Sequence, residues 1–139
     1  MAFNKTHKIL TMKESYILII DDSETNNVLL EALLEDVGYQ TKTALSAPDG
    51  WLLIHQEKPK LILLDLLMPK VSGFQMLDRL KANKKFADIP VVIVSALNEP
   101  DTIETLMKAG ADDFFSKPIN IKTIISRVQE LVPPESSIS

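Results

Sequence analysis

Unbroken apolar runs recur along the chain at residues 16–20, 61–64 and 90–94. Short runs that do not alternate with polar residues are typical of strands that are buried on both faces of a sheet. A more polar run over 39–43 and a short run over 112–115 bring the number of predicted strands to five. The polar character of 39–43 predicts that this strand lies nearer the edge of the sheet.

The segments between these runs carry apolar residues at helical spacing. We predict helices over residues 23–37, 47–56, 73–81, 101–109 and 120–131. Five βα units in a row, with strands that are apolar throughout, predict an α/β fold in which helices cover both faces of a parallel sheet. Right-handed crossovers favour a flavodoxin-like, doubly wound (βα)5 sheet with the strand order 2-1-3-4-5.

The first helix has clear end signals. Ser23 is a suitable N-cap, and Gly38 stands where a left-handed C-cap belongs. We expect the buried stripe of this helix to consist of Val28, Leu29, Ala32, Leu33 and Val37.

Composition narrows the function classes. The chain has 139 residues, the length of one domain, and no cysteine, which excludes a disulfide scaffold, cysteine-ligated zinc and iron–sulfur clusters. The net charge of -4 disfavours direct binding of nucleic acid or an anionic membrane. No apolar run approaches the roughly 18 residues of a membrane span, and the chain does not begin with a secretory signal. We therefore expect a cytoplasmic protein with a flexible leader over 1–15 and a tail or linker start over 133–139.

Polar side chains follow the predicted strands where a functional site would form. In doubly wound sheets, sites lie beyond the carboxyl ends of the strands, near the crevice between the first and third. Asp21 and Asp22 follow the first strand, Asp65 the third, Ser95 the fourth, and Lys117 comes just after the fifth. Each residue alone is as well explained by a solvated turn. Together, three converging carboxylates need a cation or a shared proton, and their oxygens favour Mg²⁺.

These blocks resemble the receiver domain of two-component response regulators. The resemblance is carried by Asp21-Asp22, by residues 61–69 with Gly73, by residues 94–96 and by residues 110–118, in that order. It covers about residues 17–131 and implies a receiver domain, CheY-like in fold, over residues 16–132.

The resemblance implies that Asp65 accepts a phosphoryl group from a phosphohistidine. The donor would be a sensor histidine kinase or a histidine phosphotransfer protein. Mg²⁺ would be held by Asp21, Asp22, Asp65 and the backbone carbonyl of Leu67, with Asp22 a direct ligand and Asp21 nearer the water shell. Lys117 would bind a phosphoryl oxygen. The chain would thus be a signalling phosphoacceptor that catalyses its own phosphorylation and a slow dephosphorylation.

The resemblance also implies a conformational switch. Ser95 would bind the phosphoryl group and move toward it, and Phe114 would turn into the vacated space. Phe114 and Phe115 should point to opposite faces of their strand. Leu67 and Leu97 stand two residues beyond Asp65 and Ser95. The resemblance implies that these two positions flank the path of an attacking water, and because both side chains are apolar we predict slow dephosphorylation.

Three other function classes fit the sequence less well. A phosphatase with an aspartyl-phosphate intermediate would need a general acid two residues after its nucleophile, where this chain has Leu67. A flavin or nucleotide carrier would need phosphate-binding loops rich in Gly, Ser or Thr. An interaction-only receiver would lack one of the catalytic positions, and in this chain none of them is missing. The downstream effector stays open, and the resemblance also allows a phosphorylation-dependent dimer.

Overall fold

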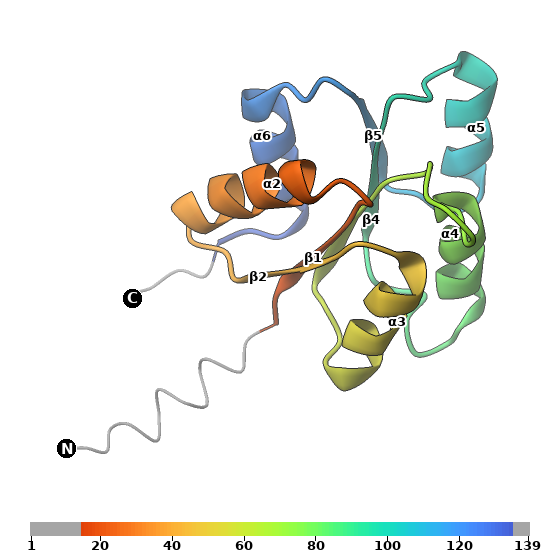
Figure 1. Ribbon diagram of the computed structural model, residues 1–139, viewed down its shortest axis with the longest axis horizontal. Helices are drawn as coiled ribbons and strands as arrows, with labels where there is room; N and C mark the ends of the chain where they lie inside the picture. The colour runs from red at the N-terminus through yellow and green to blue at the C-terminus, as the bar shows by residue number, and fades with distance from the viewer. Residues whose placement is uncertain (1–14, 135–139) are drawn as a thin grey trace.

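The protein folds around one parallel sheet of five strands (Figure 1). The computed structural model describes residues 15–134. The strand order is β2-β1-β3-β4-β5, and every neighbouring pair is parallel, which confirms the predicted topology. The strands are β1 (Ile17–Ile20), β2 (Thr41–Ala44), β3 (Leu61–Leu64), β4 (Val91–Ser95) and β5 (Asp113–Ser116).

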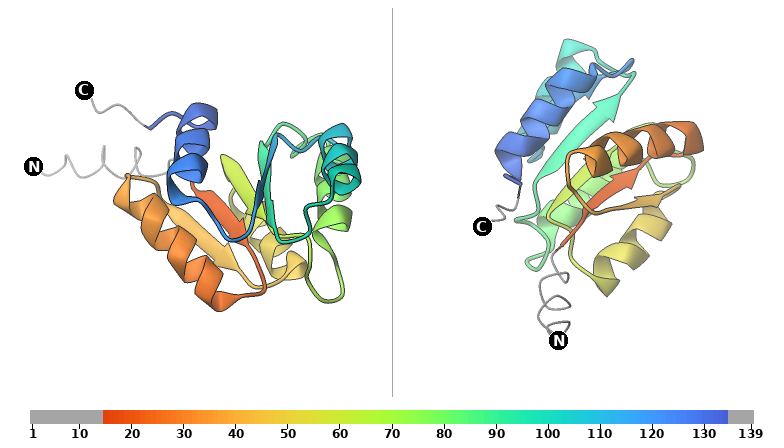
Figure 2. Two further views of the ribbon diagram at one scale, coloured as in Figure 1. Left: turned by 90° about the horizontal axis from the view of Figure 1, so that it is seen from above. Right: turned by 90° about the vertical axis from the view of Figure 1, so that its left-hand side faces the viewer.

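Helices cover both faces of the sheet (Figure 2). They are α2 (Glu24–Asp36), α3 (Ala47–Gln56), α4 (Gly73–Ala82), α5 (Pro100–Lys108) and α6 (Ile121–Leu131). α2 and α6 lie on one face, and α3, α4 and α5 lie on the other. Most predicted boundaries hold to within one residue. The polar strand begins two residues later than predicted because Tyr39 still belongs to the end of α2, where its backbone N–H donates to the carbonyl of Leu34 at 3.0 Å.

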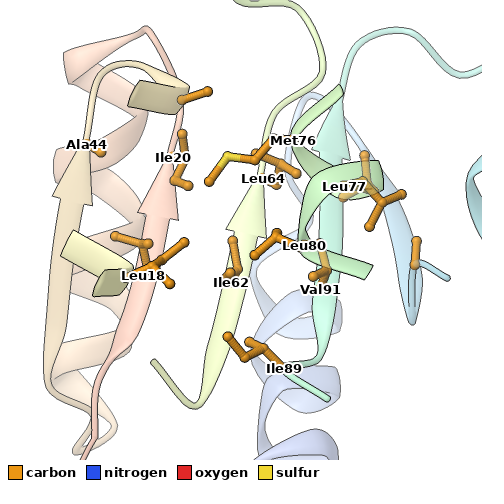
Figure 3. Packing of buried hydrophobic residues seen from close by; sticks show 14 of the residues in the cluster. Leu18, Ile20, Ala44, Ile62, Leu64, Met76, Leu77, Leu80, Ile89 and Val91 are labelled. Carbon is orange, nitrogen blue, oxygen red and sulfur yellow. The ribbon is translucent and has the colours of Figure 1, made fainter. Parts of the chain in front are cut away.

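The central strands contribute alternate residues to two separate hydrophobic cores. Leu18, Ile20, Ile62 and Leu64 face α3 and α4 (Figure 3). Their neighbours on the same strands face α2 and α6: Ile17, Ile19, Leu61 and Leu63. Both faces of these strands are therefore buried, which explains why the sequence shows unbroken apolar runs there.

The predicted buried stripe of α2 was wrong. The structure buries Asn27, Leu30 and Leu34, whereas Val28 is 56% exposed and Leu29 is 43% exposed. α2 is apolar around much of its circumference, so periodicity permits more than one stripe. The stripe that faces the sheet includes the polar Asn27, whose amide donates to the backbone carbonyls of Asp21 and Ala44.

The termini lie mostly outside the described residues. The predicted leader covers residues 1–15, of which only Ser15 is described, and its hydroxyl donates to the carbonyl of Lys58 at 2.7 Å. Of the predicted tail, Pro133 and Pro134 are described and exposed. A search of the described residues finds no helix long and apolar enough to cross a membrane.

Candidate functional site

The carboxyl ends of three adjacent strands bring the predicted site residues together. Ile20 pairs with Leu64 in the sheet, so Asp21 and Asp65 emerge side by side from β1 and β3. The backbone N–H of Asp65 donates to the carbonyl of Ile20 at 2.9 Å, which fixes this exit. Ser95 ends β4 and is fully buried. Parallel pairing thus gathers residues far apart in sequence at one edge of the sheet, as predicted.

The acidic pair after β1 has two distinct environments. Asp21 is buried, and its Oδ1 accepts from the backbone N–H of Ser23 at 2.9 Å. Its Oδ2 accepts from Lys117 Nζ at 2.8 Å and from Asn26 Nδ2 at 3.4 Å. Asp22 is exposed. The protein therefore occupies much of the Asp21 carboxylate and leaves Asp22 facing solvent.

Lys117 reaches into the acidic cluster from the loop after β5. Its Nζ lies 2.8 Å from Asp21 Oδ2 and 3.7 Å from Asp65 Oδ2. The backbone N–H of Lys117 donates to the carbonyl of Ser95 at 3.0 Å, which ties the loop to β4. The following peptide bond, to Pro118, is cis. One ammonium group therefore sits between the two buried carboxylates and balances part of their charge.

The environment of Asp65 disfavours its charged form. Burial raises the pKa of this carboxyl, and the negative charge of Asp21 raises it further. Lys117 and the backbone N–H groups of Leu67 and Leu66 act in the opposite direction but do not cancel these effects. A buried carboxylate with a raised pKa beside another acid gains from a nearby cation.

The donor atoms present fit a hard divalent cation. One carboxylate oxygen from each of Asp21, Asp22 and Asp65 lies within 4.8 Å of the other two. Carboxylate oxygens with open access to water are the ligands that Mg²⁺ prefers in proteins. The cluster can therefore hold Mg²⁺ through the exposed Asp22 and the two buried carboxylates behind it.

The remaining predicted residues surround this cluster. Ser95 Oγ accepts from the backbone N–H of Leu97 at 3.1 Å, so its proton stays available for another acceptor. Leu67 is 54% exposed, and Leu97 is half-buried against the core under α3 and α4. Phe114 packs against that same core and Phe115 against the core under α2 and α6, which confirms that they point to opposite faces. Neither ring is fully buried.

Two asparagines of α2 contact the site and were missed from the sequence. Asn26 donates to the Asp21 carboxylate, as described above. Asn27 is buried and donates through Nδ2 to the backbone carbonyls of Asp21 and Ala44. The one available signal was a polar residue at a position where the alternative helical stripe, with Leu30 and Leu34, is otherwise apolar.

Comparison with known families identifies the kind of domain to which these residues belong. The family model described as the response regulator receiver domain matches residues 17–129. This chain is a response regulator receiver domain. Accepting a phosphoryl group in two-component signalling is the function of that family.

Curated relatives of this receiver domain are of several kinds. Over 116 residues the chain is 38% identical to the DNA-binding dual master transcriptional regulator RpaA of Synechocystis, covering 84% of this chain and 48% of RpaA. It is 39% identical over 116 residues to the response regulator PleD of Caulobacter vibrioides, covering 83% of this chain and 25% of PleD. Protein PilH of Pseudomonas aeruginosa is 34% identical over 116 residues, with 84% and 96% covered. The chain thus spans about half of RpaA, about a quarter of PleD and nearly all of PilH.

Solved structures share the receiver fold. The signal receiver domain of a signal transduction histidine kinase from Syntrophus aciditrophicus superposes with a TM-score of 0.78 at 32% identity, covering 91% of this chain and 98% of that one. The chemotaxis protein CheY4 of Vibrio cholerae has a TM-score of 0.79 at 21% identity, with 85% and 98% covered. The second likeness supports the fold alone.

Proposed function

We propose that Asp65 is the phosphoacceptor of this receiver domain. The observation that carries the proposal is its position: Asp65 is only 5% exposed, directly follows β3, and lies beside the carboxylates of Asp21 and Asp22, with the ammonium group of Lys117 3.7 Å away. In the reaction an Asp65 carboxylate oxygen forms a bond to phosphorus, while the phosphorus–nitrogen bond of a phosphohistidine breaks. The imidazole leaves with the electron pair of that bond.

Mg²⁺ is the metal that we propose for the acidic cluster. Asp22, Asp65 and the backbone carbonyl of Leu67 would ligate it directly, and Asp21 would lie nearer its water shell. When bound, the ion would neutralise negative charge on the phosphoryl oxygens. The exposure of Asp22 and the occupied oxygens of Asp21 support this division of roles.

Lys117 and Ser95 would hold the phosphoryl group in place. Lys117 supplies a positive charge that already lies 3.7 Å from Asp65. Ser95 offers a hydroxyl proton from the neighbouring strand end. Such positioned charges and donors are the main means by which proteins accelerate phosphoryl transfer. We infer that the same groups support both self-phosphorylation and the slower loss of the phosphoryl group to water.

The new charge on Asp65 would drive a switch through Ser95 and Phe114. A phosphoryl group adds about 1.5 to 2 negative charges and three strong acceptors. Ser95 would give up its bond with Leu97 and turn toward these acceptors, which shifts the loop after β4. Phe114 is half-buried against the core under α3 and α4, and its ring would turn inward into the space that Ser95 leaves.

Two leucines would make the phosphorylated state long-lived. Leu67 and Leu97 carry no group that could orient a water for attack on phosphorus. The polar variant Leu67→Asn should therefore shorten the phosphoryl half-life, measured as the decay of the mass adduct. An unchanged or longer half-life would contradict this role, as would a wild-type half-life of seconds.

The experiment that tests the proposed function is intact-mass spectrometry of the full chain after incubation with acetyl phosphate. A single phosphoryl adduct should form with Mg²⁺ and not with a chelator present. Asp65→Asn should abolish it, whereas Asp78→Asn, at an exposed position of α4, should leave it unchanged. An adduct that survives in Asp65→Asn would overturn the assignment. A chain that takes no phosphoryl group from acetyl phosphate or from a phosphorylated histidine phosphotransfer protein would overturn the function.

We further propose that the phosphodonor is a sensor histidine kinase or a histidine phosphotransfer protein, and that the site of action is the cytoplasm. One of the relatives, RpaA of Synechocystis, is a DNA-binding regulator, but the described residues form only the receiver. The receiver would pass its signal to a partner or effector protein and would not bind nucleic acid directly. A phosphorylation-dependent dimer is one form of that output, and light scattering with and without the phosphodonor tests it.

A further inference from the structure

A polar side chain lies in the hydrophobic interface between α2 and the sheet. Asn27 is 2% exposed and belongs to the same buried face of α2 as Leu30 and Leu34. Its Oδ1 accepts no hydrogen bond from the protein, and within residues 15–134 no other buried side-chain polar atom is left without a partner. An unpaired buried acceptor costs free energy that an apolar side chain would not. Packing alone therefore does not account for an asparagine here.

The amide group of Asn27 joins two strand ends beside the acidic cluster. Nδ2 donates to the carbonyl of Asp21 at 3.0 Å and to the carbonyl of Ala44, the last residue of β2, at 3.2 Å. The Ala44 carbonyl also accepts from the backbone N–H of Asp21 at 3.1 Å. A flipped amide would place Oδ1 against two carbonyl oxygens, so these contacts fix its orientation.

These contacts restrict the backbone of Asp22, the residue that follows Asp21. The carbonyl of Asp21 belongs to the rigid, planar peptide unit that leads to Asp22. Holding that carbonyl holds the Asp22 backbone, although the Asp22 side chain itself is exposed. We propose that Asn27 is a positioning residue for the metal site. It orients the Asp21–Asp22 peptide so that the carboxylate of Asp22 stays close enough to that of Asp65 for both to bind one metal ion. The inference rests on the proposed function of the acidic cluster.

Mg²⁺ affinity is the property that this role predicts. Loss of a group that orients metal ligands weakens metal binding by about tenfold or more. Asn27→Leu removes both donor contacts and the unpaired acceptor, and Asn27→Ala removes them without adding bulk. Both variants should raise the Kd for Mg²⁺ about tenfold.

The matched control is Leu34→Ala, on the same buried face of α2 but without contact to the acidic cluster. Mg²⁺ titrations followed by amide shifts in ¹H–¹⁵N spectra of the full chain give the Kd for each variant, independent of any activity. The expected result is weakened Mg²⁺ binding in the Asn27 variants and a wild-type Kd in Leu34→Ala.

Two results would overturn the inference while leaving the proposed function intact. One is an unchanged Kd in both Asn27 variants. The other is an equal loss in Leu34→Ala, since Mg²⁺ affinity would then follow the stability of the helix and not the orientation of the peptide. A wild-type chain that binds no Mg²⁺ would instead overturn the metal role itself. Those outcomes are distinguishable in one set of titrations.

Discussion

Gly73, the first residue of α4, packs directly against the backbone of Asp65, the residue that we propose as the phosphoacceptor. A Cβ added at this position would lie 2.2 Å from the carbonyl oxygen of Asp65 and 2.8 Å from the Cα of Leu66. Gly73 does not have a positive φ, so its own backbone conformation would accept any residue. The requirement for glycine is therefore steric and arises from the close approach of α4 to the loop that follows β3.

The size of the disturbance follows from these contacts. Real Cβ atoms essentially never approach closer than 3.0 Å, so the Asp65 carbonyl and α4 must separate by at least about 0.8 Å in Gly73→Ala. The obstacle is backbone, so no side chain can relieve it by rotating. Overpacking of this kind costs about 1–3 kcal/mol, and the better helix propensity of alanine returns up to about 1 kcal/mol. We expect a net loss of about 1–2 kcal/mol in the free energy of unfolding.

The effect on the reaction should exceed the effect on stability. A displacement near 1 Å at a reacting group costs on the order of 100-fold in rate. Urea denaturation would measure the stability of Gly73→Ala, and the growth of the acetyl phosphate adduct would measure its phosphorylation rate below the unfolding transition. Both the stability and the phosphorylation rate should fall, and the fall in the rate should be much the larger.

Gly38→Ala is the matched control. Gly38 lies just beyond the C-cap of α2 with a φ of 99°, and nothing lies within 4 Å of an added Cβ. The substitution should cost about 1–2 kcal/mol through backbone strain alone and leave the phosphorylation rate unchanged. Wild-type phosphorylation kinetics in Gly73→Ala, or an equal loss of rate in Gly38→Ala, would refute the reasoning.

Three further predictions concern stability in the absence of Mg²⁺. Lys70 is exposed with a φ of 69°, so Lys70→Gly should raise the free energy of unfolding by up to about 1 kcal/mol, measured by urea denaturation. Asp65→Asn should stabilise the protein at pH 7, because burial and the charge of Asp21 raise the pKa of Asp65 in the folded state. That gain should shrink as the pH falls toward the ordinary aspartate value, and a constant gain would contradict it. Burial and the charge of Glu57 raise the pKa of Tyr16 to about 12. Wild-type stability should hold below pH 10 and fall by up to about 3 kcal/mol between pH 10 and 12, a fall that Tyr16→Phe should reduce.

The five strands could be predicted from the sequence because each has a local cause. A run such as residues 61–64 is apolar at every position only if both faces of the strand are covered, which requires helices on both sides of a parallel sheet. Parallel strands with right-handed connections then place all carboxyl ends at one edge. The meeting of Asp21, Asp65 and Lys117 was predictable for that reason, although they lie far apart in the chain.

Other features depend on contacts that no local pattern encodes. The buried face of α2 was predicted wrongly. When the helix docks on the sheet, the apolar Val28 is left exposed and the polar Asn27 is buried. The steric requirement at Gly73 likewise exists only because α4 approaches the loop after β3.

The sequence by itself thus determined which elements form and which functional groups follow them, since propensity and periodicity act through near neighbours. Only the tertiary structure decided how those groups are held: Lys117 closer to Asp21 than to Asp65, and Asn27 on the carbonyl of Asp21. Orientations of this kind are set by packing and hydrogen bonds between distant segments, and they become defined only when the helices dock on the sheet.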